Sequence, residues 1–371
     1  MKYIVIGDVH LGHAKTPTPH IVSSLRKHIL SDKHADIDVL FIEGDLFDRL
    51  LDLNSKEVQV IISFFDSLLN YCFLNNIKLR VLEGTPSHDV LQPEILVKLN
   101  EIRDNKVDLK YFKVLDIEYL AEENKYVLYI PDEWVNDHAV LEKQIKEKLN
   151  LLGIEQVDIA ILHGQFGYQV QGIPYTGFRF DEVYFLNLVK DLIHVGHYHT
   201  YSYFERIVAA GSFERLAHGE EEPKGYLVAK DRTYTFIPNT DAYIYKNITL
   251  RSNTTLEQLD RNIRQYPKGS HICLTMSKDH LFNLTFGELK LRYLDYNLKK
   301  KIKDESEQNQ TTYIQTDAFL DLSDKFTIDS DVQAVVLRNI QEQTTLSESE
   351  TVKLKGYLSV FKNTINQETS I

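Results

Sequence analysis

Five short segments in the first 200 residues combine histidine or aspartate with a glycine next to them or a few residues before. They are Gly7-Asp8-Val9-His10, Gly44-Asp45-Leu46-Phe47-Asp48, Gly84-Thr85-Pro86-Ser87-His88-Asp89, His163-Gly164-Gln165 and Gly196-His197-Tyr198-His199. Imidazole and carboxylate together are ligands for borderline divalent metals such as Mn, Fe and Zn. Glycine beside a ligand lets the backbone approach an ion closely. The five segments therefore predict a centre for two divalent metal ions.

Such a centre would hydrolyse phosphate esters. Two cations about 3.5 to 4 Å apart clamp a phosphate, lower the pKa of a bridging water and stabilise the in-line transition state. Any one histidine or aspartate is more often a structural group, and the chain has 14 histidines. The ordered set of five segments favours metal binding, whereas we expect His34, His138, His194, His218 and His271 to be structural.

Each of these segments follows an element that can position it. Apolar runs at 3–6, 39–42, 79–82, 159–162 and 192–195 are typical of buried strands. Helical apolar stripes lie between them, at Ile21, Val22, Leu25 and Ile29 and again at Val58, Ile61, Phe65, Leu68 and Cys72. Alternating strands and helices predict an α/β fold. Ligands in such sheets gather outside the carboxyl ends of the strands, where the five segments stand.

The rest of the chain divides into three further parts. Two more strands are expected at 203–209 and 225–236, which complete a first domain over 1–239. A β-α-β-α-β pattern follows, with strands at 243–250, 271–276 and 297–302 and helices at 256–266 and 280–293; it predicts a small domain over 240–303. A polar linker at 304–329 then leads to a helical tail at 330–371.

Composition limits the class of protein. A length of 371 residues exceeds what one core usually supports, and 43% hydrophobic residues can fill more than one. The N-terminus has no signal-peptide pattern and no apolar run approaches about 20 residues, so we expect a cytoplasmic protein without a membrane span. Cys72 and Cys273 stand alone, which argues against disulfides and thiolate zinc. The net charge of −12 disfavours nucleic-acid binding unless bound cations or a partner offset it.

The five segments resemble the motifs of the calcineurin-like metallophosphoesterases. The resemblance covers about 200 residues and implies a two-sheet α/β sandwich flanked by helices, followed here by a small α+β capping domain and the helical tail. It implies that Asp8, His10 and His199 bind the first metal, that Asp45 bridges, and that His163 and His197 bind the second. The family usually supplies an Asn ligand where this chain has Ser87. Ser87, Thr85 or a water would complete that shell and bind the second metal more weakly.

The same resemblance assigns residues to the substrate. His88 would face the scissile phosphate and protonate the leaving oxygen, and Asp89 would orient His88. His13 is a further candidate for substrate contact.

The segment Gly211-Ser212-Phe213-Glu214-Arg215, with Gly219-Glu220 and Lys224-Gly225 after it, resembles the SbcD-type nucleases. This resemblance implies DNA as substrate, Arg215 as a candidate contact, and two divalent ions, with Mn²⁺ first and Mg²⁺, Fe²⁺ or Zn²⁺ as alternatives. The small domain would cover DNA with basic residues, namely Arg251, Arg261, Arg264, Lys268, Lys290, Arg292, Lys299, Lys300, Lys301 and Lys303.

In SbcD-type complexes the C-terminal helices bind the coiled-coil base of an SbcC-type ABC ATPase. The tail has suitable apolar faces, at Val332, Val335, Val336, Ile340, Val352, Leu354, Leu358 and Phe361, although they could also pack on their own chain. The resemblance also implies a homodimer. Two other interpretations stay open: a stand-alone phosphodiesterase or phosphatase, and a degenerate subunit without catalysis.

Overall fold

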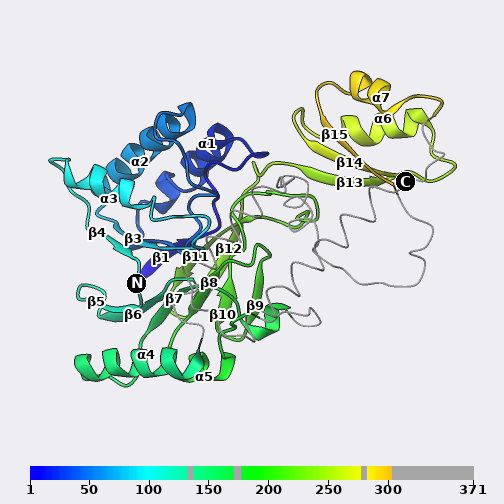
Figure 1. The fold of residues 1–371 in the computed structure, drawn as a ribbon. Coiled ribbons are helices and arrows are strands. Elements are labelled where there is room, and N and C mark those ends of the chain that lie inside the picture. The colour runs from blue at the N-terminus through cyan, green and yellow to red at the C-terminus, as the bar shows by residue number, and fades with distance from the viewer. Residues whose placement is uncertain (133–136, 171–176, 277–281, 303–371) are drawn as a thin grey trace, which may run out of the picture. The chain divides into compact units, whose positions relative to one another are not determined.

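The computed structural model describes residues 1–132, 137–170, 177–276 and 282–302 (Figure 1). These residues belong to one compact unit, Met1–Gln310. They build two six-stranded sheets, a three-stranded sheet and the helices beside them. The linker predicted at 304–329 and the helical tail predicted at 330–371 lie outside the described residues.

The first six-stranded sheet contains the strands that precede the first three sequence motifs. Its order is β12 (Thr233–Pro238), β11 (Gly225–Lys230), β1 (Lys2–Ile6), β2 (Val39–Ile42), β3 (Lys78–Leu82) and β4 (Leu109–Phe112). Strands β1 to β4 are parallel, so their carboxyl ends meet at one edge. Its helices are α1 (Thr18–His28), α2 (Lys56–Leu74) and α3 (Glu94–Glu101), with a 3₁₀ turn at Asp32–His34.

The second six-stranded sheet contains the strands that precede the other two motifs. Its order is β5 (Asp116–Leu120), β6 (Lys125–Ile130), β7 (Ile159–His163), β8 (Ile193–Gly196), β10 (Ile207–Ala209) and β9 (Ser202–Phe204). Strands β6, β7, β8 and β10 are parallel to one another. Helices α4 (His138–Leu152) and α5 (Glu182–Leu188) accompany this sheet, with a 3₁₀ turn at Gly167–Val170.

The two sheets pack face to face because both faces of their central strands are apolar. In β1, Tyr3 and Val5 point into the core between the sheets, whereas Ile4 and Ile6 pack with the helices α1 and α2. The outer face of the second sheet packs with α4 and α5 in the same way. Figure 1 shows α1, α2 and α3 on one side of the sheets and α4 and α5 on the other. The described residues thus form a mixed α/β fold with two six-stranded sheets flanked by helices, which is compatible with the predicted two-sheet sandwich.

Two segments expected to be single strands are hairpins. Residues 203–209 divide into β9 and β10, and residues 225–236 divide into β11 and β12, each pair being antiparallel. The chain reverses where Glu205 and Asp231 adopt positive φ angles of 51° and 53°. Both turns are charged, Glu205-Arg206 and Lys230-Asp231-Arg232, but neither contains the glycine or proline that most clearly marks a turn in sequence.

The three-stranded sheet alternates with two helices. Its elements are β13 (Tyr245–Thr249), α6 (Leu256–Arg264), β14 (His271–Met276), α7 (Phe286–Arg292) and β15 (Asn297–Ile302). All three strands are parallel, which makes this part α/β in type where α+β was expected. Helix α7 begins after Thr285, whose side chain forms a capping box with Glu288. The helices and one sheet face enclose a separate apolar cluster that includes Leu259, Leu274 and Leu289.

Helix α2 is long and apolar enough to cross a membrane by length and composition alone. Its apolar side chains, among them Phe65, Leu68 and Leu69, are buried in the core beside the first sheet. A core helix of this kind passes the same composition test, so α2 is weak support for a membrane span.

Candidate metal centre

The motif residues of both sheets meet at the carboxyl ends of their strands. Asp8 and His10 follow β1, Asp45 follows β2, Thr85 and His88 follow β3, His163 ends β7, and His197 and His199 follow β8. Four of these residues have positive φ angles: 47° for Asp8, 53° for His10, 49° for Asp45 and 96° for His197. Such backbone is uncommon outside glycine and concentrates at functional sites.

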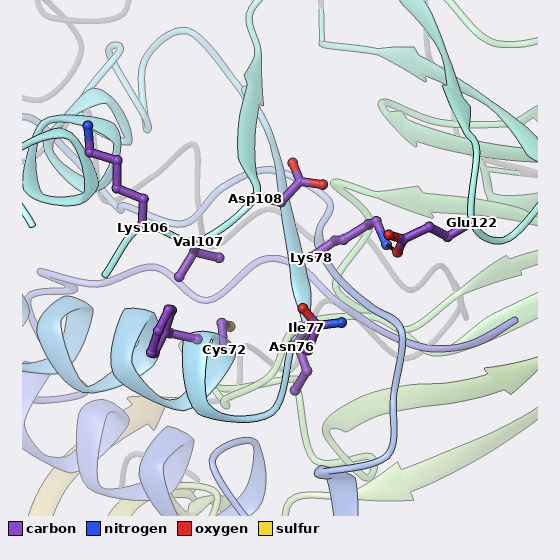
Figure 2. A pocket seen from close by; sticks show the side chains of 9 residues that line it. Cys72, Asn76, Ile77, Lys78, Lys106, Val107, Asp108 and Glu122 are labelled. Carbon is purple, nitrogen blue, oxygen red and sulfur yellow. Dashed lines mark hydrogen bonds and ion pairs between the residues drawn. The ribbon is translucent and has the colours of Figure 1, made fainter. Parts of the chain in front are cut away.

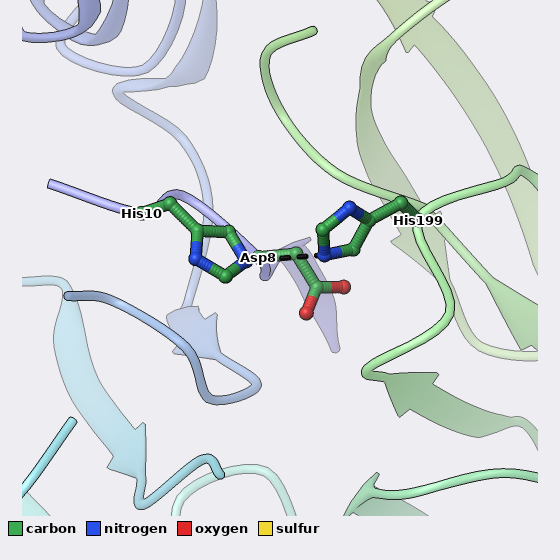
Figure 3. A group of neighbouring side chains, drawn as sticks. All are labelled: Asp8, His10 and His199. Carbon is green, nitrogen blue, oxygen red and sulfur yellow. Dashed lines mark hydrogen bonds between the residues drawn. The ribbon is translucent and has the colours of Figure 1, made fainter. Parts of the chain in front are cut away.

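Asp8, His10 and His199 form a first cluster whose ligand atoms lie within 4.8 Å of one another (Figure 3). The Nε2 atoms of His10 and His199 face each other at 3.1 Å. Asp8 is buried, and its carboxylate accepts the backbone N–H of His197 with both oxygens at 3.0 Å. The carboxylate of Glu220 lies 3.0 Å from Nδ1 of His199.

The surroundings of these two histidines suit a cation. Glu220 on His199, and Asp48 at 3.2 Å from Nδ1 of His10, favour protons on both Nδ1 atoms. Two Nε2 lone pairs would then point at each other across 3.1 Å, which is repulsive until a positive charge lies between them. Nitrogens bound to one cation at about 2.1 Å are separated by about 3 to 3.4 Å. The first cluster can therefore hold a metal ion.

Asp45, His163 and His197 form a second cluster within the same 4.8 Å limit. Nδ1 of His163 donates to the carbonyl of Glu43 at 2.7 Å, which leaves Nε2 free to bind a metal, 3.4 Å from Oδ1 of Asp45. Burial by itself lowers the pKa of His163, but the carboxylates of Asp45, Asp8 and Asp132 raise it well above the usual range. These carboxylates thus favour a positive charge at Nε2 of His163, which is what a metal site requires.

Asp45 lies between the two clusters. One carboxylate oxygen is 3.4 Å from Nε2 of His163 and the other is 3.8 Å from Nε2 of His10. Burial opposes its ionisation, yet the pKa of Asp45 is lowered because His163, His10 and His88 surround the carboxylate. This ionised carboxylate can serve both cation positions at once.

Two glycines make room for this arrangement. A Cβ atom on Gly44, whose φ is 97°, would lie 2.3 Å from Nδ1 of His163. A Cβ atom on Gly84 would lie 2.1 Å from the backbone nitrogen of Asp45. Any larger residue at either position would displace a candidate ligand.

Thr85, and not Ser87, has its hydroxyl among the second cluster. Oγ1 of Thr85 is 3.2 Å from Asp45, 3.4 Å from Nε2 of His163 and 3.3 Å from Nδ1 of His197. Ser87 is exposed. Both residues are short hydroxyl side chains in one loop, so sequence alone could not say which turns inward.

His88 and Asp89 have separate partners. Nδ1 of His88 donates to the backbone carbonyl of Asp48 at 2.6 Å, and His88 also belongs to a group with His10 and Asp45. Asp89 is fully buried and accepts the backbone N–H groups of Phe47 and Gly84, each at 2.8 Å. Burial, together with Asp45, raises the pKa of Asp89 to about 8. These contacts of Asp89 brace the ligand loops, and a backbone carbonyl orients His88.

The two candidate substrate residues also have local partners. Nδ1 of His13 accepts the N–H groups of Lys15 and Thr16, and burial lowers the pKa of His13 to about 4. Arg215 donates to the carbonyls of Ala242, Tyr243 and Glu222. Arg215 thus ties the loop before β11 to the chain that enters the three-stranded sheet.

Sequence reasoning gave no role to Glu220, Asp48 or Asp132. Glu220 and Asp48 stand beside His199 and His10, respectively. Asp132 lies 3.7 Å from Nδ1 of His197 with its Oδ2 atom. Each of the three lies in a motif segment or just after a strand. Polar residues are common at such positions, so only their contacts in the structure distinguish these three.

A pocket of about 180 Å³ lies elsewhere on the first sheet (Figure 2). Ile77, Lys78, Val107 and Asp108 line it at the points where β3 and β4 begin, next to Cys72 of α2. It is therefore at the amino-terminal edge of the parallel strands, opposite to the metal-ligand clusters, and contributes nothing to them.

No family model matches the chain, and no curated protein matches it. Among solved structures, 29 chains match. One of them is 13% identical and aligns over 64% of this chain and 99% of its own length, with a TM-score of 0.38. A likeness this distant carries no argument about function, which is therefore inferred from the residues of the two clusters.

Proposed function

We propose that this chain is a metallophosphoesterase that hydrolyses DNA phosphodiester bonds with two divalent metal ions, Mn²⁺ being the first candidate. We further propose that it is the nuclease subunit of a DNA repair or recombination complex of the SbcD type. The position of Asp45 is the observation that supports the two-metal centre most directly, because its two oxygens face histidines of different clusters.

The cluster residues would divide between the two ions. Asp8, His10 and His199 would hold the first, His163 and His197 the second, and Asp45 both. When bound, such a pair of ions polarises a phosphate and activates a water molecule as the nucleophile. Glu220 and the Glu43 carbonyl each hold an Nδ1 atom of a ligand histidine, so that the Nε2 atoms face the ions.

His88 would act on the substrate. Its Nδ1 atom is held by the Asp48 carbonyl, and its ring lies edge-on to His10 with centroids 4.9 Å apart. A protonated His88 in this position would offer its Nε2 proton to the oxygen that leaves phosphorus. Because this proton transfer occurs in the transition state, His88 would raise turnover more than binding.

The three-stranded sheet supports a polynucleotide over a small phosphodiester. Lys299 and Lys301 are exposed on β15 and, by strand alternation, point away from the face that Leu298 packs against helices α6 and α7. Asn247 of β13 shares that helix-free face. Positive charge and amide groups on one sheet surface suit a phosphate backbone.

The partners are proposed from the resemblance of the sequence motifs. An SbcC-type ABC ATPase with a coiled coil would bind the tail, and two copies of this chain would form a homodimer. Cytoplasmic location belongs to the same proposal.

A single assay tests the nuclease activity. Purified protein with Mn²⁺ is incubated with end-labelled linear duplex DNA and, separately, with bis-p-nitrophenyl phosphate, beside an Asp45→Asn variant and an Asp104→Asn control at an exposed position. We expect metal-dependent DNA cleavage that Asp45→Asn abolishes and Asp104→Asn retains. Cleavage of the small diester alone would replace the nuclease by a stand-alone phosphodiesterase, and no cleavage of either, with the ATPase partner also present, would reject catalysis.

A further inference from the structure

The two cation positions have unequal donor sets when only the motif residues are counted. The first has two histidines with Asp8 and the shared Asp45, whereas the second has two histidines with Asp45 alone. The remaining motif group near the second position is the Thr85 hydroxyl, which is neutral. A cation at the second position would therefore meet one carboxylate fewer.

Asp132 is a carboxylate next to the second cluster on the His197 side, outside the group whose ligand atoms all lie within 4.8 Å of one another. It follows β6, which pairs in parallel with β7, and Ile130 is in register with Leu162, the residue before His163. Both strands therefore deliver Asp132 and His163 to the same edge of the second sheet. The side chain of Asp132 is 11% exposed, and its Oδ2 atom is 3.7 Å from Nδ1 of His197. Two ligands of one cation are typically separated by about 3 to 4 Å.

We propose that Asp132 is a ligand of the second metal ion and supplies the charge that the motif residues leave out. This inference rests on the proposed two-metal centre. Each ion would then have two histidines, one carboxylate of its own and a share of Asp45. Three carboxylates, Asp8, Asp45 and Asp132, would face two divalent cations, so the loaded centre would keep a net positive charge for a phosphodiester.

The Thr85 hydroxyl has a different role in this arrangement. Its backbone N–H donates to Oδ1 of Asp45 at 2.6 Å and its hydroxyl donates to Oδ2 of the same carboxylate at 3.2 Å. Thr85 therefore orients Asp45, the shared ligand, and Asp132 rather than Thr85 would bind the second ion.

Bonding between residue 132 and a metal is tested directly by Asp132→Cys with Cd²⁺. A thiolate bound to Cd²⁺ gives an ultraviolet charge-transfer absorption, and thiolates are favoured ligands of soft metals. The two native cysteines, Cys72 and Cys273, are both buried, so the unmodified chain provides the blank. We expect the absorption in Asp132→Cys and not in Thr85→Cys. Absorption in Thr85→Cys alone would overturn the proposal and make Thr85 the ligand, and absorption in neither would overturn it as well.

The affinity of the second ion gives a further test by calorimetric titration with Mn²⁺. We expect two Mn²⁺ ions to bind per chain. In Asp132→Asn the affinity for the second ion should fall by at least about tenfold, while the affinity for the first is unchanged. Asp104→Asn is the matched control. Equal affinities for both ions in Asp132→Asn and the parent chain would contradict the proposal. Neither measurement uses DNA, so the result for Asp132 would stand even if the protein proved not to cleave DNA. If the protein is a nuclease and Asp132→Asn binds the second ion with unchanged affinity, only the role of Asp132 is rejected.

Discussion

Glu220 holds His199 by a carboxylate-to-imidazole contact of 3.0 Å, although no sequence motif of metal ligands contains Glu220. The other oxygen of the same carboxylate accepts the backbone N–H of Leu216 at 3.1 Å and lies 3.3 Å from the buried ammonium of Lys224. Burial opposes ionisation of Glu220, but His199 and Lys224 lower its pKa to about 2. Glu220 is therefore ionised throughout the neutral range and fixes Nδ1 of His199 as the protonated nitrogen.

Replacing Glu220 by Gln should lower the affinity for the first metal ion by about 10- to 100-fold, because the His199 imidazole loses the carboxylate that orients it and raises its basicity. Calorimetric titration with Mn²⁺ measures this loss. The matched control is Glu221→Gln, since Glu221 accepts from Lys246 and Asn247 instead of a candidate ligand. Equal losses in both variants would show that the loop acts as a whole and that Glu220 has no special position.

Replacing His88 by Asn should lower turnover of bis-p-nitrophenyl phosphate or DNA by about 10²-fold or more, the usual contribution of a general acid. An Asn amide can still donate to the Asp48 carbonyl, so the loop should remain in place. Mn²⁺ affinity, measured beside kcat, should stay within about threefold of the parent value. Loss of metal binding together with turnover would make His88 a ligand and not the acid; His138→Asn, at an exposed position, is the control.

Arg80 is a buried cation between the sheets, and its loss should destabilise the fold. Its guanidinium donates to both oxygens of Glu118, at 2.8 and 2.9 Å, and both side chains are almost fully buried. Arg80→Met leaves Glu118 with Lys110 at 2.8 Å and the Tyr129 hydroxyl at 3.1 Å. The free energy of unfolding should therefore fall by about 3 kcal/mol, the lower end of the cost of breaking a buried ion pair. Urea unfolding measures the change. Lys98→Met, which removes an exposed ion pair with Glu101, should change stability much less, and similar losses in both would refute the burial argument.

His194 should make stability depend on pH. Burial lowers its pKa to about 3 from an ordinary 6.5, and its Nε2 atom lies 3.1 Å from the hydroxyl of Tyr3. Below pH 6.5 the unfolded chain binds a proton at His194 that the folded chain does not, so stability falls as pH decreases from 6.5 toward 3. This group contributes a slope of up to about 1.4 kcal/mol per pH unit.

The variant His194→Gln isolates that contribution. Glutamine can still bond the Tyr3 hydroxyl but cannot take up a proton, so the variant should lose less stability than the parent between pH 7.5 and pH 5. Urea unfolding in the presence of a metal chelator makes the comparison. Parallel pH profiles for the two proteins would show that His194 is not the group responsible.

The sequence alone determined the α/β layering and the residue types of the candidate metal centre. Strands such as 39–42 and 271–276 were predicted with their observed bounds, because each is a short apolar run between turn signals. The turns at Glu205 and Asp231 were not predicted, because neither contains glycine or proline. The ligand-type residues could be named because glycine, aspartate and histidine stand together at strand ends, where α/β sheets place their ligands.

Only the tertiary structure decided which polar groups meet. It turned Thr85 inward and left Ser87 exposed, gave His88 the Asp48 carbonyl in place of Asp89, and brought Asp132 beside His197. These pairings join loops from two separate sheets, and the distance between their side chains depends on how the sheets pack. Sequence spacing fixes the edge of the sheet at which a side chain emerges, whereas packing of the shared core fixes what lies across from it.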